Sequence, residues 1–156
     1  NGSPQQFQRV LLVAARTYAM YHVGRGTKHA DEFYTVDATY DQVYRGYGAE
    51  ARDPNVVAAV DATRGQIVTY QGRLAITPYY SRSDGRTRAW GEVWGGGSQY
   101  PWLVSVPVPW DNGQSLLGHG VGMSARGALM MANEGKFYDD ILGYFYPGTE
   151  LRRAYR

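Results

Sequence analysis

The first 22 residues constrain the fold of this chain most, because they predict one long helix that is apolar on nearly every side. We expect the helix to run from Pro4 to about His22, with Ser3 and Gln6 forming a capping box at its start. Its apolar residues recur at helical spacing and extend around most of its circumference. A helix of this kind is a buried core element. The rest of the chain must therefore fold around it.

Two arginines interrupt this apolar helix. Arg9 and Arg16 are separated by almost two helical turns and so share a face. Burying a guanidinium group is costly unless the group is paired or faces a wet cleft. Two interpretations stay open. Both side chains extend to the surface or pair with structural carboxylates, or this face of the helix lines a functional site.

Composition narrows the class of protein. With 156 residues, 44% of them hydrophobic, the chain is expected to form one domain with a proper core. A net charge of +2 is too small to indicate binding to nucleic acid or to an anionic membrane. The absence of cysteine excludes disulfides, thiolate metal sites and a cysteine nucleophile. Twenty glycines indicate tight turns, and 14 tyrosines suit either ordinary packing or contact with sugar rings.

Beyond the first helix, the pattern predicts short helices and strands in alternation. Asp53-Pro54-Asn55 is a helix-start signal. Helices are expected at 56–65, 123–133 and 138–145, and strands at 66–70, 74–80 and 101–108. Residues 71–73 are expected to form a hairpin turn, and 81–97 a long loop. Because the strands look hairpin-connected, we predict an α+β fold, a single compact domain with a central buried N-terminal helix, rather than a parallel sheet.

Few residues carry recognisable metal-site or nucleophile chemistry. The histidines His22, His29 and His119 lack the spacing of zinc ligands, so no metal site is expected. Asp37 and Asp41 lie in a polar cluster that lacks the full calcium-loop pattern.

The glycine-rich stretch at 118–124 is more informative. Glycines on both sides of His119 allow close approach of backbone or ligand, and Ser124 can cap the helix behind them. His119 then either hydrogen-bonds a nearby carbonyl in a structural turn or contacts a ligand.

Eight stretches occur in the following order: VAARTYAMYH (13–22), TYDQVYRG (39–46), AVDATRGQIVTYQG (59–72), YYSRSDGRT (79–87), EVWG (92–95), YPWLVSVPVPWD (100–111), GHGVGMSARGA (118–128) and YPGTEL (146–151). Together they resemble the SpoIID/LytB domain of bacterial cell-wall proteins. The resemblance covers nearly the whole chain, so we expect residues 1–156 to form one domain of this kind, lacking the family's segment before the first helix. It implies an extracytoplasmic protein, in the cell envelope or secreted.

The resemblance also implies a function. Members of the family are lytic transglycosylases that cut peptidoglycan glycan strands, or enhancers of a cell-wall amidase. In the enzymes, one carboxylic acid protonates the leaving oxygen and then assists attack by the muramic 6-hydroxyl, which yields a 1,6-anhydro product. Laid on this chain, the family's catalytic glutamate falls one to three residues before Asn1. We therefore expect no catalytic residue within the 156 residues.

By resemblance, nine residues would line the glycan-binding cleft: Arg9, Arg16, Tyr40, Gln42, Tyr44, Tyr80, Ser81, Ser83 and His119. Guanidinium groups suit acetamido or lactyl oxygens, amides and hydroxyls suit sugar hydroxyls, and tyrosines suit ring faces. Glu92 matches a family glutamate whose role we take as structural, and Tyr40 replaces a family histidine, so zinc is not expected.

The sequence is compatible with three functions. The first is lytic transglycosylation with peptidoglycan glycan strands as the substrate and no cofactor. The alternative is a non-catalytic module that binds glycan or recruits a cell-wall amidase. A hydrolase that uses Asp37 or Asp41 is the third.

Overall fold

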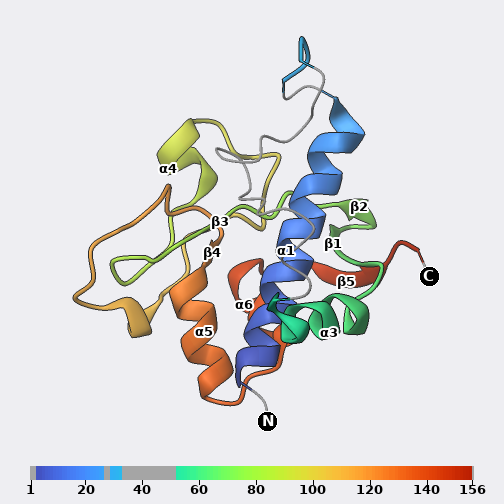
Figure 1. Ribbon diagram of the computed structural model, residues 1–156. Helices are drawn as coiled ribbons and strands as arrows, with labels where there is room; N and C mark the ends of the chain where they lie inside the picture. Colours follow the sequence, from blue (N-terminus) through green and yellow to red (C-terminus); the bar gives the residue numbers. More distant parts are fainter. Residues whose placement is uncertain (1–2, 27–28, 33–51, 156) are drawn as a thin grey trace.

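Helix α1 (Ser3–Arg25) passes through the middle of the computed structural model, which describes residues 3–26, 29–32 and 52–155 (Figure 1). It packs against four other elements: α3 (Pro54–Ala62), β1 (Gln66–Tyr70), α5 (Ala125–Asn133) and α6 (Tyr138–Phe145). Val10, Val13 and Ala14 are fully buried in these contacts. The prediction of a central core helix is therefore confirmed, although the helix ends at Arg25 rather than at His22.

The other predicted helices exist, two of them with shifted bounds, since α3 replaces 56–65 and α5 begins two residues after 123. The predicted loop at 81–97 contains the additional helix α4 (Trp90–Trp94). Both α3 and α5 are capped as local rules indicate. The Asp53 carboxylate accepts the backbone N–H of Val56 at 3.2 Å and caps α3, with proline at the first helical position. The Ser124 hydroxyl accepts the backbone N–H of Gly127 at 3.1 Å and caps α5, as predicted. Helix α6 has the predicted bounds.

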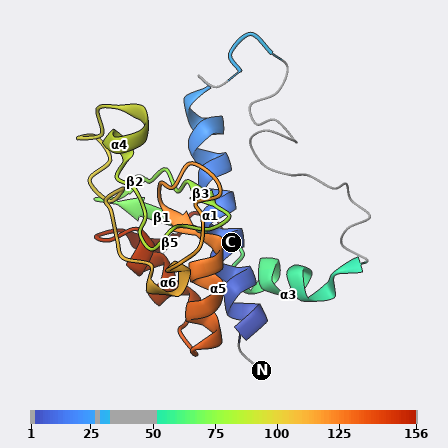
Figure 2. The same ribbon diagram turned by 90° about the vertical axis from the view of Figure 1, so that its left-hand side faces the viewer.

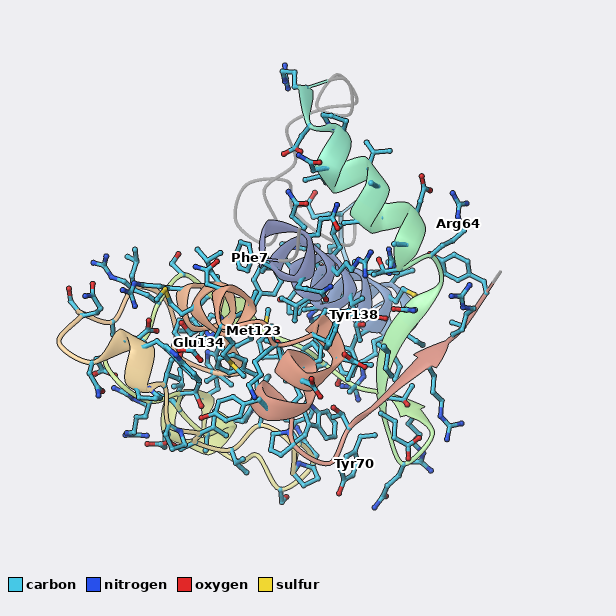
Figure 3. The ribbon with its side chains drawn as sticks, turned by 90° about the horizontal axis from the view of Figure 1, so that it is seen from below. Phe7, Arg64, Tyr70, Met123, Glu134 and Tyr138 are labelled. Carbon is cyan, nitrogen blue, oxygen red and sulfur yellow. The ribbon has the colours of Figure 1, made fainter. Side chains whose placement is uncertain are left out.

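The predicted capping box of α1 is described only in part. The Ser3 side chain lies outside the described residues. The Gln6 side-chain oxygen accepts the backbone N–H of Tyr138 at 3.0 Å, which ties the first turns of α1 to the start of α6. Figure 3 shows Tyr138 beside α1, viewed from below. Gln6 therefore makes a tertiary contact that helix-capping rules do not predict.

One sheet is antiparallel and has the strand order β2-β1-β5. Strand β2 (Arg73–Leu74) forms the predicted hairpin with β1, and β5 (Glu150–Arg153) pairs with the other edge of β1. The sequence did not predict β5, because ELRR is short, mostly exposed and without alternation of apolar and polar residues.

The second sheet corrects the expectation that all strands are hairpin-connected. Strand β3 (Tyr79–Tyr80) pairs in parallel with β4 (Met123–Ser124), far along the chain. The predicted strand 74–80 is thus split between two sheets. Its middle is buried against α1, where the Thr77 hydroxyl donates to the Ala14 carbonyl at 2.9 Å.

The predicted strand at 101–108 is also wrong. This stretch is irregular apart from an isolated bridge between Pro107 and Arg86, since two prolines in it cannot donate to a ladder. Short helices α4 (Trp90–Trp94) and η1 (Pro109–Asp111) lie on either side of it. Figure 2 shows α4 and its loops on one side of α1 and α3 on the other. The fold is α+β, as predicted, and forms one compact domain.

Candidate functional site

The two arginines of α1 have different surroundings. Arg16 donates to the carbonyls of Thr63 at 2.7 Å and Gln66 at 3.0 Å, so it joins the end of α3 to the start of β1. The Arg9 guanidinium carbon lies 5.9 Å from the centre of the Tyr138 ring. Its buried Nε has no hydrogen-bond partner within the described part of the chain. Arg16 is therefore held by backbone carbonyls and not by the structural carboxylate that the first interpretation offered. The second interpretation, that this face of the helix lines a site, stays a prediction.

Three of the nine predicted cleft residues, Tyr40, Gln42 and Tyr44, lie outside the described residues, as do Asp37 and Asp41.

The next predicted residues lie at the end of β3 and directly after it, and they differ in exposure. Ser81 is exposed. Ser83 is fully buried, and its backbone N–H and hydroxyl both donate to the Asp111 carboxylate, at 2.8 and 2.9 Å. Tyr80 is 5% exposed, and its hydroxyl has no partner of ordinary hydrogen-bond geometry among the described residues. Burial raises the pKa of Tyr80, and the nearby Ser83 side chain opposes that rise, so the phenol stays protonated.

Asp111 organises this part of the molecule and was not singled out from the sequence. Its fully buried carboxylate accepts hydrogen bonds from the hydroxyl of Ser124 at 2.6 Å and from the Arg126 guanidinium at 2.9 Å, besides Ser83. Burial raises the pKa of Asp111, but these hydrogen bonds outweigh it and the pKa is lowered. Asp111 therefore stays ionised, and it joins η1 to the segment after β3, to β4 and to α5. The signal in the sequence that could have identified Asp111 was its position at the end of the YPWLVSVPVPWD motif. The residues that hydrogen-bond to it are distant in sequence, so the motif alone did not show its role.

His119 lies beside Tyr80, with ring centres 5.5 Å apart. Its Nδ1 accepts the backbone N–H of Val121 at 3.0 Å. Burial lowers the pKa of His119, against a hydrogen bond with the Tyr79 backbone that raises it. The imidazole is therefore neutral at neutral pH. His119 can both brace the turn and contact a ligand, because its hydrogen-bonded imidazole ring also forms part of an aromatic surface.

That surface is a row of neighbouring rings, each tilted by 48–58° to the next, and is here called the aromatic row. It runs from Tyr80 and His119 through Trp94 and Trp90 to Tyr100. Successive ring centres lie 5.5, 5.1, 4.4 and 4.3 Å apart. Trp94 is 47% exposed, which is high for so large an apolar side chain. The sequence placed Trp90 and Trp94 in a loop without assigning them a role.

The aromatic row ends at a pocket of about 620 Å³. Its lining comes from the end of α1, the β1–β2 hairpin and the loop after α4: Tyr21, Arg25, Tyr70, Gln71, Arg73, Leu74, Ser98, Gln99, Tyr100, Pro101 and Trp102. None of these residues was predicted as a site residue, because they are scattered over three distant segments. The contacts of Arg9 and Arg16 described above lie elsewhere. Of the predicted residues that the structure describes, it brings together Tyr80, Ser81, Ser83 and His119.

Within the described residues, no cluster of three or more histidine, aspartate or glutamate side chains is placed to hold a metal ion. No helix in the same part of the chain combines the length and apolar character needed to cross a membrane.

The chain resembles known proteins over most of its length. A family model named SpoIID, described as stage II sporulation protein, matches residues 3–70. Stage II sporulation protein D of Bacillus subtilis (strain 168) is 25% identical over 91% of this chain, which covers 67% of that relative. An uncharacterized protein of Brachyspira hyodysenteriae (strain ATCC 49526 / WA1) is 35% identical over 72% of the chain, and 31% of that relative is covered.

A further relative is named Amidase enhancer, also from Bacillus subtilis (strain 168). It is 36% identical over 60% of this chain, which covers 11% of that relative. The chain thus spans about two thirds of the first relative and less than a third of the other two. The family model, these relatives and the eight ordered motifs support the assignment to the SpoIID/LytB family that the sequence resemblance predicts.

Proposed function

We propose that this chain, a member of a cell-wall-related family, is an extracytoplasmic domain that cleaves peptidoglycan glycan strands by lytic transglycosylation. Its acid would be the glutamate expected one to three residues before Asn1. In this reaction the carboxylic acid gives its proton to the glycosidic oxygen between N-acetylmuramic acid and N-acetylglucosamine. The bond between that oxygen and the muramic anomeric carbon breaks, and N-acetylglucosamine leaves with the oxygen as a hydroxyl. The muramic 6-hydroxyl forms a bond to the same anomeric carbon and gives its proton to the carboxylate.

The aromatic row is the observation that carries this proposal. Sugar rings have apolar faces and polar edges, and flat aromatic side chains bind such faces by stacking. A row of rings that leads from Tyr80 to Tyr100, with Trp94 exposed in the middle, suits an extended polymer of sugars better than a single small ligand.

The carboxylates beside the aromatic row do not suit the role of general acid. This supports a catalytic acid that lies outside the 156 residues. Asp84, Glu92 and Asp111 each pair with an arginine. Hydrogen bonds from arginine lower the pKa of Asp84 and Glu92, and those from serine, backbone and arginine do so for Asp111. A general acid needs a raised pKa so that it carries a proton at neutral pH. Glu92 also accepts the backbone N–H of Ala89 at 2.6 Å, which supports its structural role.

His119 and Tyr80 then position the sugar rather than transfer protons, since both are neutral over the physiological range. Arg9 keeps its proposed role as a contact for acetamido or lactyl oxygens. Arg16 is a weaker candidate, because two backbone carbonyls already occupy its donors.

The test is to digest glycan strands freed of stem peptides with the full-length protein and to identify the product ends by mass spectrometry. The proposal predicts 1,6-anhydro-muramic ends, which disappear when the upstream glutamate is replaced by glutamine. Ordinary reducing ends, or no cleavage under conditions where glycan is bound, would rule out lytic transglycosylation.

A second function, a non-catalytic module that binds glycan and enhances a cell-wall amidase, is favoured by one finding. The relative that is 36% identical to this chain is named Amidase enhancer. This function predicts that the protein retains glycan without cutting it and that it accelerates peptide release by an added cell-wall amidase. Cleavage to anhydro ends in the absence of any amidase would argue against it.

A further inference from the structure

Strand β2 is an edge of the three-stranded sheet, and among the described residues no further strand pairs with its outer side. Arg73 pairs with Tyr70 where the hairpin closes. The Ala75 N–H donates to the Val68 carbonyl at 3.1 Å, so the backbone on either side of Leu74 is bonded to β1. Backbone groups of successive residues alternate in direction along an antiparallel strand. Leu74 therefore directs its N–H and carbonyl away from the sheet.

The pocket of about 620 Å³ lies directly beside this edge, and Arg73 and Leu74 belong to its lining. Residues 98–102 form another part of the lining, and the Trp102 indole N–H donates to the Ile76 carbonyl at 2.8 Å. Ile76 is two residues after Leu74, so in an extended chain its carbonyl points to the same side. Trp102 thus occupies one acceptor beside the edge, and Leu74 is the next position at which a second backbone can pair.

Aromatic rings that are held in place form the walls of the pocket. The ring centres of Tyr70 and Trp102 are 5.0 Å apart, and those of Tyr100 and Trp102 are 5.8 Å apart. The hydroxyls of Tyr21 and Tyr100 lie 3.2 Å apart in the pocket wall. Rings held in this way can receive an apolar side chain without losing much side-chain entropy of their own.

The charge of the pocket has one sign. Arg25 and Arg73 are exposed members of the lining, and none of the lining residues that the structure describes carries a carboxylate. Arg25 lies over the Tyr21 ring, 5.0 Å from its centre, and donates to the Tyr21 hydroxyl. Burial and Tyr100 raise the pKa of Tyr21 to about 12, so its phenol stays neutral. The pocket therefore complements a ligand that is both apolar and negatively charged.

The opposite edge of the sheet, β5, has a different character. Glu150, Arg152 and Arg153 are all exposed, and Arg152 pairs with Glu150 at 2.9 Å. Charged side chains along an edge strand discourage pairing with another chain. Strand β2 carries a single charged residue, Arg73, beside an apolar one. The two edges thus differ, and β2 is the one that suits a partner strand.

We propose that the outer edge of β2 and the pocket beside it are a docking site for an extended acidic segment of a partner protein. The backbone of the segment pairs with Leu74, an apolar side chain lies among the rings, and carboxylates meet Arg25 and Arg73. Strand addition of this kind gains affinity from main-chain hydrogen bonds and specificity from pockets for alternate side chains. A saccharide lacks the regularly alternating N–H and carbonyl groups of a peptide chain. This docking site is independent of glycan cleavage.

The experiment begins with a library of random nine-residue peptides displayed on phage and selected on the full-length protein. The same library is selected in parallel on a variant that combines Arg25→Gln with Arg73→Gln. We expect the peptides enriched on the wild type to alternate acidic with apolar residues. Peptides of this kind should not be enriched on the variant, because the carboxylates lose both guanidinium partners.

The most enriched peptide is then synthesised in four forms, and calorimetry measures their affinities. One form is unmodified, one has amides in place of its carboxylates, and two carry N-methyl groups on alternate backbone nitrogens, at odd or at even positions. We expect the unmodified form to bind about tenfold more tightly than the amide form. One N-methylated form should lose binding and the other keep it, because only one edge of an extended peptide can face β2.

Substitutions in the protein locate the charge preference. The combined Arg25→Gln and Arg73→Gln variant should bind the acidic and amide forms equally. Arg64→Gln is the matched control and should bind as the wild type does. Arg64 and Tyr70 lie toward opposite ends of β1 (Figure 3), and Arg64 is an exposed arginine outside the pocket. The melting temperature verifies that each variant is folded.

A second pair of substitutions tests the backbone of the edge. Leu74→Pro removes the outward N–H without removing a hydrogen bond to β1, a position at which proline is tolerated in edge strands. It should weaken binding of the unmodified peptide about tenfold. Leu74→Val keeps the N–H and an apolar side chain, so its affinity should stay close to that of the wild type.

Equal selection on the wild type and the arginine variant would overturn the inference, as would equal affinities of the acidic and amide forms or of the two N-methylated forms. Displacement of the peptide by an N-acetylglucosamine–N-acetylmuramic acid tetrasaccharide, with or without stem peptides, would also overturn it, because the pocket would then belong to the substrate. Glycan cleavage to anhydro ends is measured separately. Cleavage without peptide binding refutes the docking site alone, and peptide binding without cleavage refutes lytic transglycosylation alone.

Discussion

Asp111 is the residue whose surroundings depend most on the fold. A fully buried carboxylate is tolerated only because Ser83, Ser124 and Arg126 donate to it. Asp111→Asn removes the charge that these donors were placed to meet, so we expect a loss of about 3 kcal/mol in the free energy of unfolding. Urea denaturation at neutral pH measures this loss.

The matched control is Asp61→Asn. Asp61 pairs with Arg64 at 2.7 Å, but both side chains are more than half exposed. We expect the control to change stability by less than about 1 kcal/mol. Equal effects of the two substitutions would contradict the role assigned to the Asp111 network.

The same residue makes a prediction about pH. The pKa of Asp111 is lower in the folded protein than in the unfolded chain, where aspartate titrates near about 3.9. The unfolded chain therefore binds the proton more readily than the folded protein does. The stability contributed by ionised Asp111 is fully present above the unfolded-state pKa and is lost as the pH falls through the folded-state pKa. The stability difference between wild type and Asp111→Asn should shrink as the pH falls below about 4, in urea denaturation repeated across that range. A difference independent of pH would show that packing, not charge, causes it.

At the scale of elements, the glycine-rich turn holds β4 against β3. A side-chain Cβ at Gly122 would lie 2.1 Å from the Pro78 carbonyl oxygen, and the residue has φ 78°. Gly122→Ala should destabilise the protein by about 2 kcal/mol more than Gly135→Ala, as measured by urea denaturation. Gly135 has φ 88° but open space where its Cβ would be, so this control carries the same backbone strain without the clash. Similar losses for both variants would mean that the β3–β4 contact is not tight.

The contact between α1, α3 and β1 depends on Arg16. We expect Arg16→Met to lower the free energy of unfolding by about 2 kcal/mol, because the Thr63 and Gln66 carbonyls lose a charged donor. Arg64→Met, on an exposed side chain, should have little effect on stability. If Arg16→Met left stability intact and weakened glycan binding instead, the residue would belong to the cleft after all.

At the scale of the whole molecule, the aromatic row connects segments that share no sequence neighbourhood. Trp94→Ala should weaken binding of stem-peptide-free glycan fragments about 3- to 10-fold with little change in melting temperature, since a stacked ring contributes about 0.5–1.5 kcal/mol and Trp94 is half exposed. Phe137→Ala removes an aromatic side chain that is 61% exposed and outside this row, so calorimetry should show unchanged affinity. Equal losses for both variants would remove the row from the binding surface.

Local signals in the sequence determined several elements of this protein. The apolar helix predicted the core, and Ser124 and Asp53 predicted two helix starts, because caps act within a few residues of themselves. Strand β1 and its hairpin turn also followed from short-range pattern. The family resemblance rested on ordered motifs and named Tyr80, Ser83 and His119 together, and the structure brings them into one region.

Only the tertiary structure decided the partners of Arg16, the split of the predicted strand 74–80, the Asp111 network and the pocket beside Tyr100. Each depends on groups that are far apart in the chain and meet only after packing, such as Arg16 and Thr63 or Ser83 and Asp111. The opening helix illustrates the division. Its apolar pattern required burial. The pattern could not show that backbone carbonyls would accept hydrogen bonds from Arg16 or that Arg9 would lie over an aromatic ring, because those groups come from the end of α3, from β1 and from α6.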